Sequence, residues 1–249
     1  MKFVEGSWYH YLYMLSPFII IALLYLIFNK KSEKTKYIVG VVIGVLSLGV
    51  LALRNVDIFI RNGFDPQIIP LQVCHFGNIV VFIALVFKSK IATAMAWTFN
   101  LIPAYSSLVV VDALTGYANI FTSIRAQAYI WGHLLIIVGA MYPVVLKTIK
   151  FDKKSFNISL AITAGLFAIS IFLNTYFTDF LKRKINYFYA YNSNGVPFKD
   201  FYNLGKPITI GSWFTVNLVY VAFLIVLGLV VIYLMYGASR LLYRTREKQ

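Results

Sequence analysis

Residues Pro70–Phe87 read PLQVCHFGNIVVFIALVF, an almost wholly apolar run that contains the only cysteine of the chain near its start. A helix that crosses a membrane needs about 20 largely apolar residues. Of the 249 residues, 60% are hydrophobic and 13% are charged, whereas soluble domains are roughly 25% charged. We therefore predict an all-α polytopic membrane helical bundle in a cell membrane. Its seven expected transmembrane runs are 10–29, 37–53, 70–87, 91–111, 127–146, 155–176 and 214–239.

The 23 Lys and Arg residues give a formal net charge of +14, which by itself would suit a nucleic-acid partner. They lie between the apolar runs, as is typical of loops that meet anionic lipid headgroups, so no nucleic-acid binding is expected. One side of the predicted bundle holds 14 of these cations and the other holds 9. The positive-inside rule then predicts an outside N terminus and a cytoplasmic C terminus. The 14 cations lie in segments 30–36, 88–90, 147–154 and 240–248.

No internal repeat or second domain is visible, so we expect residues 1–249 to form a single multi-spanning domain. The outer loop 177–213 is rich in Tyr, Phe and Asn, which favours an ordered segment at the membrane surface over a flexible linker. In the run 91–111, Asn100 and Pro103 interrupt the apolar pattern. A proline there frees a backbone carbonyl, which predicts a kink inside the bundle.

Cys74 is the first candidate for chemistry. Pro70 suits the first turn of a helix, which would place Cys74 about 6 Å along that helix at 1.5 Å per residue. A thiol near a helix N terminus has its thiolate favoured by the helix dipole. Asn78 lies four residues further, on the same face. The alternative is that Cys74 is inert packing, as buried free cysteines usually are.

His133 is an ionisable residue inside an otherwise apolar run, and such residues tend to face the interior of a bundle. With Tyr129 and Trp131 at the outer interface, His133 lies about 6 Å deep, level with Cys74. A cysteine and a histidine in contact form an activated nucleophile, in which imidazole takes the thiol proton. The alternative is a histidine that only satisfies a backbone carbonyl.

Other polar residues give weaker signals. His75 points about 100° away from Cys74, and His10 is expected at the interface. Three asparagines, Asn100, Asn174 and Asn186, can orient the histidine or donate to an oxyanion, or they can make ordinary interhelical hydrogen bonds. A zinc site formed by Cys74, His75 and His133 lacks any ligand-spacing signature, so we expect no metal and no cofactor.

The quoted run, the segment YIWGHLLIIVGAMYP (129–143) and the motif INYFYAY followed by GKP resemble the bacterial YwaF-like integral membrane proteins. These are related to the transmembrane protein 164 family, and the resemblance covers about residues 66–235. It implies a bacterial plasma-membrane location and acyl transfer between membrane phospholipids without coenzyme A. The Cys and His of that activity map onto Cys74 and His133. A more distant, androgen-induced group hydrolyses lipid esters with a Thr and a His.

The leading hypothesis is thus a lipid acyltransferase or transacylase that works through an acyl-Cys74 intermediate on membrane phospholipids. A lipid ester hydrolase is a related possibility. A substrate-binding or transport subunit is the alternative of a different class, with His133, Asn100 and the broken fourth run around a ligand cavity. A structural partner in a membrane complex is a third. The residues expected to bind substrate are Asn78, Asn100, Asn186 and Tyr187.

Overall fold

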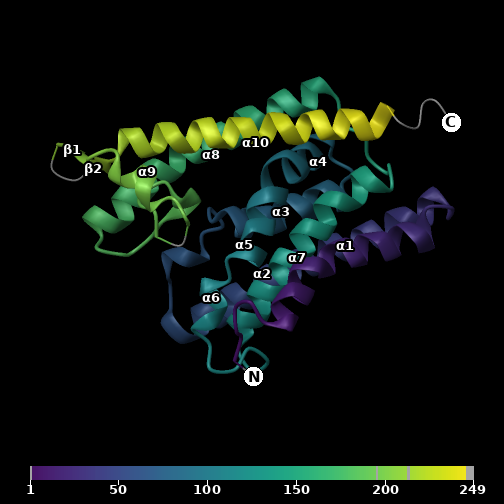
Figure 1. The fold of residues 1–249 in the computed structure, drawn as a ribbon, viewed down its shortest axis with the longest axis horizontal. Coiled ribbons are helices and arrows are strands. Elements are labelled where there is room, and N and C mark those ends of the chain that lie inside the picture. Colours follow the sequence, from purple (N-terminus) through teal and green to yellow (C-terminus); the bar gives the residue numbers. More distant parts are fainter. Residues whose placement is uncertain (1, 195, 212–213, 245–249) are drawn as a thin grey trace.

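The structure is a computed structural model that describes residues 2–194, 196–211 and 214–244, and it is dominated by helices (Figure 1). The only strands among these residues form a small antiparallel hairpin. In chain order the elements are α1 (Trp8–Phe28), α2 (Glu33–Asn62), η1 (Pro66–Ile68), α3 (Val73–Val86), α4 (Lys90–Met95), η2 (Ala96–Asn100), α5 (Leu101–Val109), α6 (Asp112–Thr115), α7 (Ile124–Val145), α8 (Lys153–Thr175), η3 (Tyr176–Phe180), η4 (Tyr187–Tyr189), α9 (Lys199–Asn203), β1 (Ile208–Ile210), β2 (Phe214–Val216) and α10 (Leu218–Arg244).

Six helical segments in the described part of the chain are long and apolar enough to cross a membrane. They correspond to six of the seven predicted runs, and they confirm an all-α, multi-pass membrane protein. The remaining run, the fourth (91–111), is helical from Lys90 to Val109 but is not among the segments that are long and apolar enough to cross a membrane. Its expected irregularity takes the form of the π-helical segment η2, in which the Leu101 N–H donates to the Ala96 carbonyl. This segment ends three residues before Pro103, whose missing N–H already interrupts the regular ladder.

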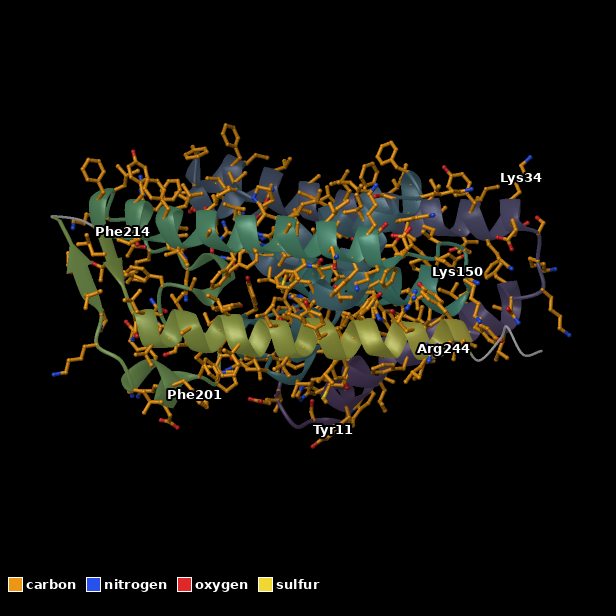
Figure 2. The ribbon with its side chains drawn as sticks, turned by 90° about the horizontal axis from the view of Figure 1, so that it is seen from above. Tyr11, Lys34, Lys150, Phe201, Phe214 and Arg244 are labelled. Atoms are coloured by element: carbon orange, nitrogen blue, oxygen red, sulfur yellow. The ribbon has the colours of Figure 1, made fainter. Side chains whose placement is uncertain are left out.

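The helices alternate in direction as the charge pattern predicts. Figure 2 shows Lys34, Lys150 and Arg244 at one end of the molecule and Phe214 at the opposite end. These three residues represent three of the four cation-rich segments, which therefore share one side of the bundle. The fourth segment joins them there, because Lys88 Nζ lies 4.1 Å from the ring centroid of Tyr37, near the start of α2. That this side faces the cytoplasm remains a prediction from the positive-inside rule.

The outward surface of the bundle is apolar. Large aliphatic side chains on the outer faces of α1 and α10 are exposed, for example Leu26 at 75% and Leu234 at 68%. Polar side chains such as Ser47 and Asn78 are instead buried between helices. This distribution suits a surface covered by lipid, because polar groups within hydrocarbon need partners inside the protein.

Helix α7 lies at the centre of the bundle and packs against α1, α2, α3 and α5. Glycines at the contact with α3 allow the two backbones to approach closely, as is common in membrane helix packing. A Cβ added at Gly77 would lie 3.2 Å from the side chain of Ile136, and one added at Gly139 would collide with Val81. These contacts set the distance between α3 and α7.

Gly139→Leu should therefore destabilise the protein by about 1–3 kcal/mol, because the added side chain overfills the α3–α7 contact. In detergent this corresponds to a lowering of Tm by roughly 2–10 °C. Gly165→Leu is the matched control, since a Cβ at Gly165 of α8 meets no atom within 4 Å. Equal melting temperatures for the two variants would show that the close contact is unimportant for stability.

Candidate active site

A cavity of about 1050 Å³ lies between α3, α5 and α7 on one side and α8 and α10 on the other. This volume is at the upper end of the usual range for small-molecule sites. Most of the wall is apolar, and its aliphatic side chains come mainly from α5, α8 and α10. Polar side chains gather on the remaining wall, among them Arg54, Cys74, His75, Arg125, His133 and Tyr189.

Cys74 is the second residue of α3, which begins at Val73 and not at Pro70. The prediction of the helix start is wrong because Gln72, two residues after Pro70, still adopts extended backbone with ψ 135° and forms the N-cap of α3. The chain turns through 69–72 instead, so Cys74 lies in the first helical turn, where the dipole acts most strongly.

The thiol and the imidazole are in direct contact. His133 Nε2 lies 2.9 Å from Cys74 Sγ, and His133 Nδ1 lies 2.7 Å from the Tyr129 carbonyl oxygen. Because a carbonyl only accepts hydrogen bonds, Nδ1 carries the proton and Nε2 is left as the acceptor that faces the thiol. The histidine thus satisfies a backbone carbonyl and contacts Cys74 at the same time.

Ser107 of α5 was not anticipated from the sequence. Its Oγ lies 3.9 Å from Cys74 Sγ and donates to the Pro103 carbonyl oxygen at 3.1 Å. A hydroxyl rotates freely, so Ser107 can redirect this proton to a thiolate. The π-helical segment η2 rotates the residues that follow it relative to a regular α-helix. The sequence pattern therefore gives no signal that Ser107 faces Cys74.

Asn78 lines the cavity and braces the first turn of α3. Its Nδ2 donates to the Cys74 carbonyl oxygen at 3.0 Å, and its Oδ1 accepts from Ser47 Oγ at 2.7 Å. Asn100 is fully buried outside the cavity wall, where its Nδ2 donates to the Val73 carbonyl oxygen at 3.3 Å. Both asparagines therefore position the backbone that carries Cys74.

Asn186 and Tyr187 lie in the outer loop and do not line the cavity. Asn186 bonds within the loop, with Nδ2 donating to the Asn192 carbonyl oxygen at 2.9 Å. The buried Tyr187 is held by Asn174, whose Nδ2 donates to the Tyr187 carbonyl oxygen at 2.8 Å and whose Oδ1 accepts from its N–H. The Tyr187 hydroxyl donates to the Pro66 carbonyl oxygen, which anchors the loop beside the start of α3.

The loop reaches the cavity through the next two residues, Phe188 and Tyr189. Both adopt left-handed backbone, with φ of 53° and 55°, which is costly for bulky side chains. Phe188 stacks on Phe99 of η2 with ring centroids 5.6 Å apart. Burial raises the pKa of Tyr189 to about 12, so its hydroxyl stays protonated at neutral pH and can donate a hydrogen bond.

The remaining histidines have separate places. His10 is buried, not interfacial: its Nε2 lies 2.9 Å from the Leu108 carbonyl oxygen, and its Nδ1 accepts from the Gly6 N–H. His75 lines the cavity, and its Nδ1 is buried without a hydrogen-bond partner among the described residues. Within 2–194, 196–211 and 214–244, no three His, Cys, Asp or Glu side chains are arranged to hold a metal ion.

Comparison with known proteins supports the resemblance found in the sequence. The TMEM164 family profile matches residues 6–236. Neither the curated proteins nor the solved structures include a significant match. Nothing in these comparisons places the chain in the YwaF-like bacterial branch. Because the matched segment covers nearly the whole chain and includes both Cys74 and His133, the protein belongs to the TMEM164 family of multi-pass membrane proteins.

Proposed function

We propose that the protein is a membrane-embedded acyltransferase that moves an acyl chain between phospholipids through a thioester on Cys74. The observation that carries this proposal is the 2.9 Å contact between Cys74 Sγ and His133 Nε2, with the imidazole oriented by the Tyr129 carbonyl. A nucleophile, a base and a group that orients the base are the common elements of covalent acyl transfer. A subunit that only binds or transports a ligand has no need of this arrangement.

In the first half-reaction, His133 Nε2 takes the thiol proton as Cys74 Sγ attacks the carbonyl carbon of a lipid ester. The tetrahedral intermediate collapses, the ester C–O bond breaks, and the imidazolium returns the proton to the departing lysolipid hydroxyl. In the second half-reaction, Nε2 takes the proton of an acceptor hydroxyl, which attacks the thioester carbon. The new ester leaves, and the imidazolium reprotonates the thiolate.

The first turn of α3 supplies groups that suit the developing oxyanion. The N–H groups of Cys74 and His75 have no intrahelical partner, since the first N–H groups of any α-helix lack one. The N-cap residue, Gln72, makes no side-chain capping bond. These backbone donors beside the nucleophile, together with the helix dipole, can stabilise negative charge on the carbonyl oxygen.

The rest of the cavity suits an acyl chain. The lining residues of α8 run from Leu160 to Ile171, which corresponds to about 16 Å along the helix axis. Their counterparts on α10 run from Leu224 to Ile232. These aliphatic walls offer an acyl chain an apolar surface that disfavours water, which supports transfer to a second lipid over hydrolysis.

Detection of the thioester is the direct test. Protein in phosphatidylcholine nanodiscs without an acceptor should gain the mass of one acyl group on Cys74, because deacylation then has only water. Neutral hydroxylamine should remove that mass, and Cys74→Ala should never acquire it. Turnover of a labelled donor with no acyl mass on Cys74 at any time would contradict the covalent mechanism.

A further inference from the structure

Two arginines line the polar end of the cavity, outside the Cys74–His133 pair: Arg54 of α2 and Arg125 of α7. Arg54 follows directly after the apolar run 37–53, and Arg125 is the second residue of its helix. Helix α2 has 30 residues and is about 45 Å long, against roughly 30 Å for the hydrocarbon core. The end of α2 that carries Arg54 therefore reaches the headgroup layer.

The heights of these side chains can be counted from a common level. A Cβ added at Gly132 would lie 3.6 Å from Asn78 Nδ2 and 3.8 Å from Val50 Cγ1, so α2, α3 and α7 meet there. At 1.5 Å per residue, Arg54 lies about 6 Å from that level toward the headgroup end, and Cys74 lies at the same height. Arg125 lies about 10 Å from it in the same direction. Arg54 thus lies at the height of the thiol, and Arg125 lies closer to the headgroup layer.

The hydrogen-bond donors of both arginines are only partly used. Arg54 Nη1 donates to Asn55 Oδ1 and to the Gln67 carbonyl oxygen, and Arg54 takes part in no ion pair within the described part of the chain. Arg125 contacts Asp57 Oδ2 through Nε at 3.3 Å, which leaves its two terminal nitrogens. Asp57 is shared with Arg61, so one carboxylate faces two cations there. Asp65 is the other carboxylate that acts electrostatically on Arg54. Three arginines therefore face two carboxylates at this end of the cavity, which leaves an excess of positive charge.

A guanidinium group matches the oxygen atoms of a phosphate with two parallel donors. An anion placed between Arg54 and Arg125 would also relieve the repulsion between their like charges. His75 adds a buried, unpartnered Nδ1 to the same wall. Donors and charge therefore favour a phosphate-bearing ligand over a neutral one.

We propose that Arg54 and Arg125 bind the phosphodiester of a glycerophospholipid. This inference rests on the proposed acyl transfer and assigns the headgroup end of its substrate. The phosphate and the ester carbonyls of such a lipid are a few bonds apart on one glycerol. With the phosphate on the arginines, an ester carbonyl lies at the height of Cys74 and the acyl chain extends between α8 and α10. Neutral glycerides lack the anion and bind more weakly.

Binding can be measured without chemistry, because Cys74 is the only cysteine of the chain. A dialkyl-ether phosphatidylcholine has no acyl group to transfer, so it reports occupancy through protection of Cys74 from a maleimide, followed by intact mass. We expect this lipid to protect wild-type protein, and Arg54→Gln or Arg125→Gln to raise the half-protecting concentration about tenfold, as for loss of a charge-assisted contact. Arg54→Lys should recover part of the affinity.

Arg61→Gln is the matched control, because Arg61 also pairs with Asp57 but does not line the cavity. The half-protecting concentration of the diether lipid for this variant should equal that for wild type. Dialkylglycerol, which lacks the phosphate, should protect Cys74 weakly and to the same extent in every variant. Melting temperatures identify any variant that fails to fold. If one arginine variant does not fold, the other still tests the phosphate site.

Equal protection by dialkylglycerol and the diether phospholipid in wild type would overturn the phosphate site, as would unchanged phospholipid protection in folded Arg54→Gln and Arg125→Gln. Protection by inorganic phosphate alone at similar concentrations would assign the site to a soluble anion and overturn the lipid assignment. If the arginines control protection but no thioester forms on Cys74, the proposed acyl transfer fails and the phosphate site stands. If the thioester forms while the arginines have no effect on protection, the phosphate site fails and the proposed acyl transfer stands.

Discussion

Replacing His133 by Ala should slow the alkylation of Cys74 at neutral pH by about 10²–10³-fold, because Nε2 at 2.9 Å is the base that generates the thiolate. With one cysteine in the chain, the rate can be followed as a single mass shift of the whole protein. The same substitution should lower acyl transfer at least as far, since the imidazole serves both half-reactions.

His133→Gln provides a second variant that keeps a polar side chain without a base. His10→Ala is the control, because it removes another buried histidine that does not line the cavity. We expect His133→Gln to react as slowly as His133→Ala and His10→Ala to react at the wild-type rate. Wild-type alkylation rates in a folded His133 variant would show that Cys74 is reactive without a base, and the proposed mechanism would be wrong.

Gly228→Phe should reduce the transfer of long acyl chains by on the order of a hundredfold while leaving short chains nearly unaffected. Gly228 of α10 lines the cavity, and a Cβ added there meets no atom within 4 Å, so the new side chain has room to enter the lumen. Displacing about four methylene groups costs ~3 kcal/mol at ~0.8 kcal/mol each. Competition between donors with acyl chains of different length measures the effect directly.

Gly237→Phe is the matched control on the same helix. Its added Cβ also meets no atom within 4 Å, and Gly237 does not line the cavity. Its chain-length preference should equal that of wild type. If Gly228→Phe transfers long and short chains in the wild-type ratio, the acyl chain occupies some other part of the protein.

Most of the fold follows from the sequence because hydrophobic run length is a direct physical requirement of the bilayer. The segment 91–111, whose apolar pattern Asn100 and Pro103 interrupt, is the one built from three helical pieces. The helix start near Pro70 was misplaced because proline suits turns as well as a first helical turn. Here the chain turns through 69–72, and Gln72 is the N-cap of α3.

The sequence placed Cys74 and His133 on helices of the same direction in the outer half of the bundle, and this made their contact predictable. Their depths are not equal: counted from the Gly132 level, the His133 backbone lies about 7.5 Å deeper than that of Cys74, and its side chain reaches back toward the start of α7 to meet the thiol. The surroundings of the pair were not, because they depend on which face each helix turns inward. Arg54 and Arg125 were counted only as loop cations for topology, although both line the cavity. In the loop, Tyr187 was expected to meet a ligand, but Asn174 draws it inward and leaves Tyr189 on the cavity wall.

The left-handed backbone at Phe188 and Tyr189 stores conformational strain in this part of the loop. Each residue holds roughly 1–3 kcal/mol of conformational strain, which the anchoring of Tyr187 must offset. Releasing Phe188 and Tyr189 from the cavity wall returns that energy, so the free-energy barrier to parting the loop from the cavity is smaller than its buried aromatic contacts suggest. On the proposed function, a segment that is ordered at rest and costs little to displace would let a lipid reach Cys74 without unfolding the surrounding bundle.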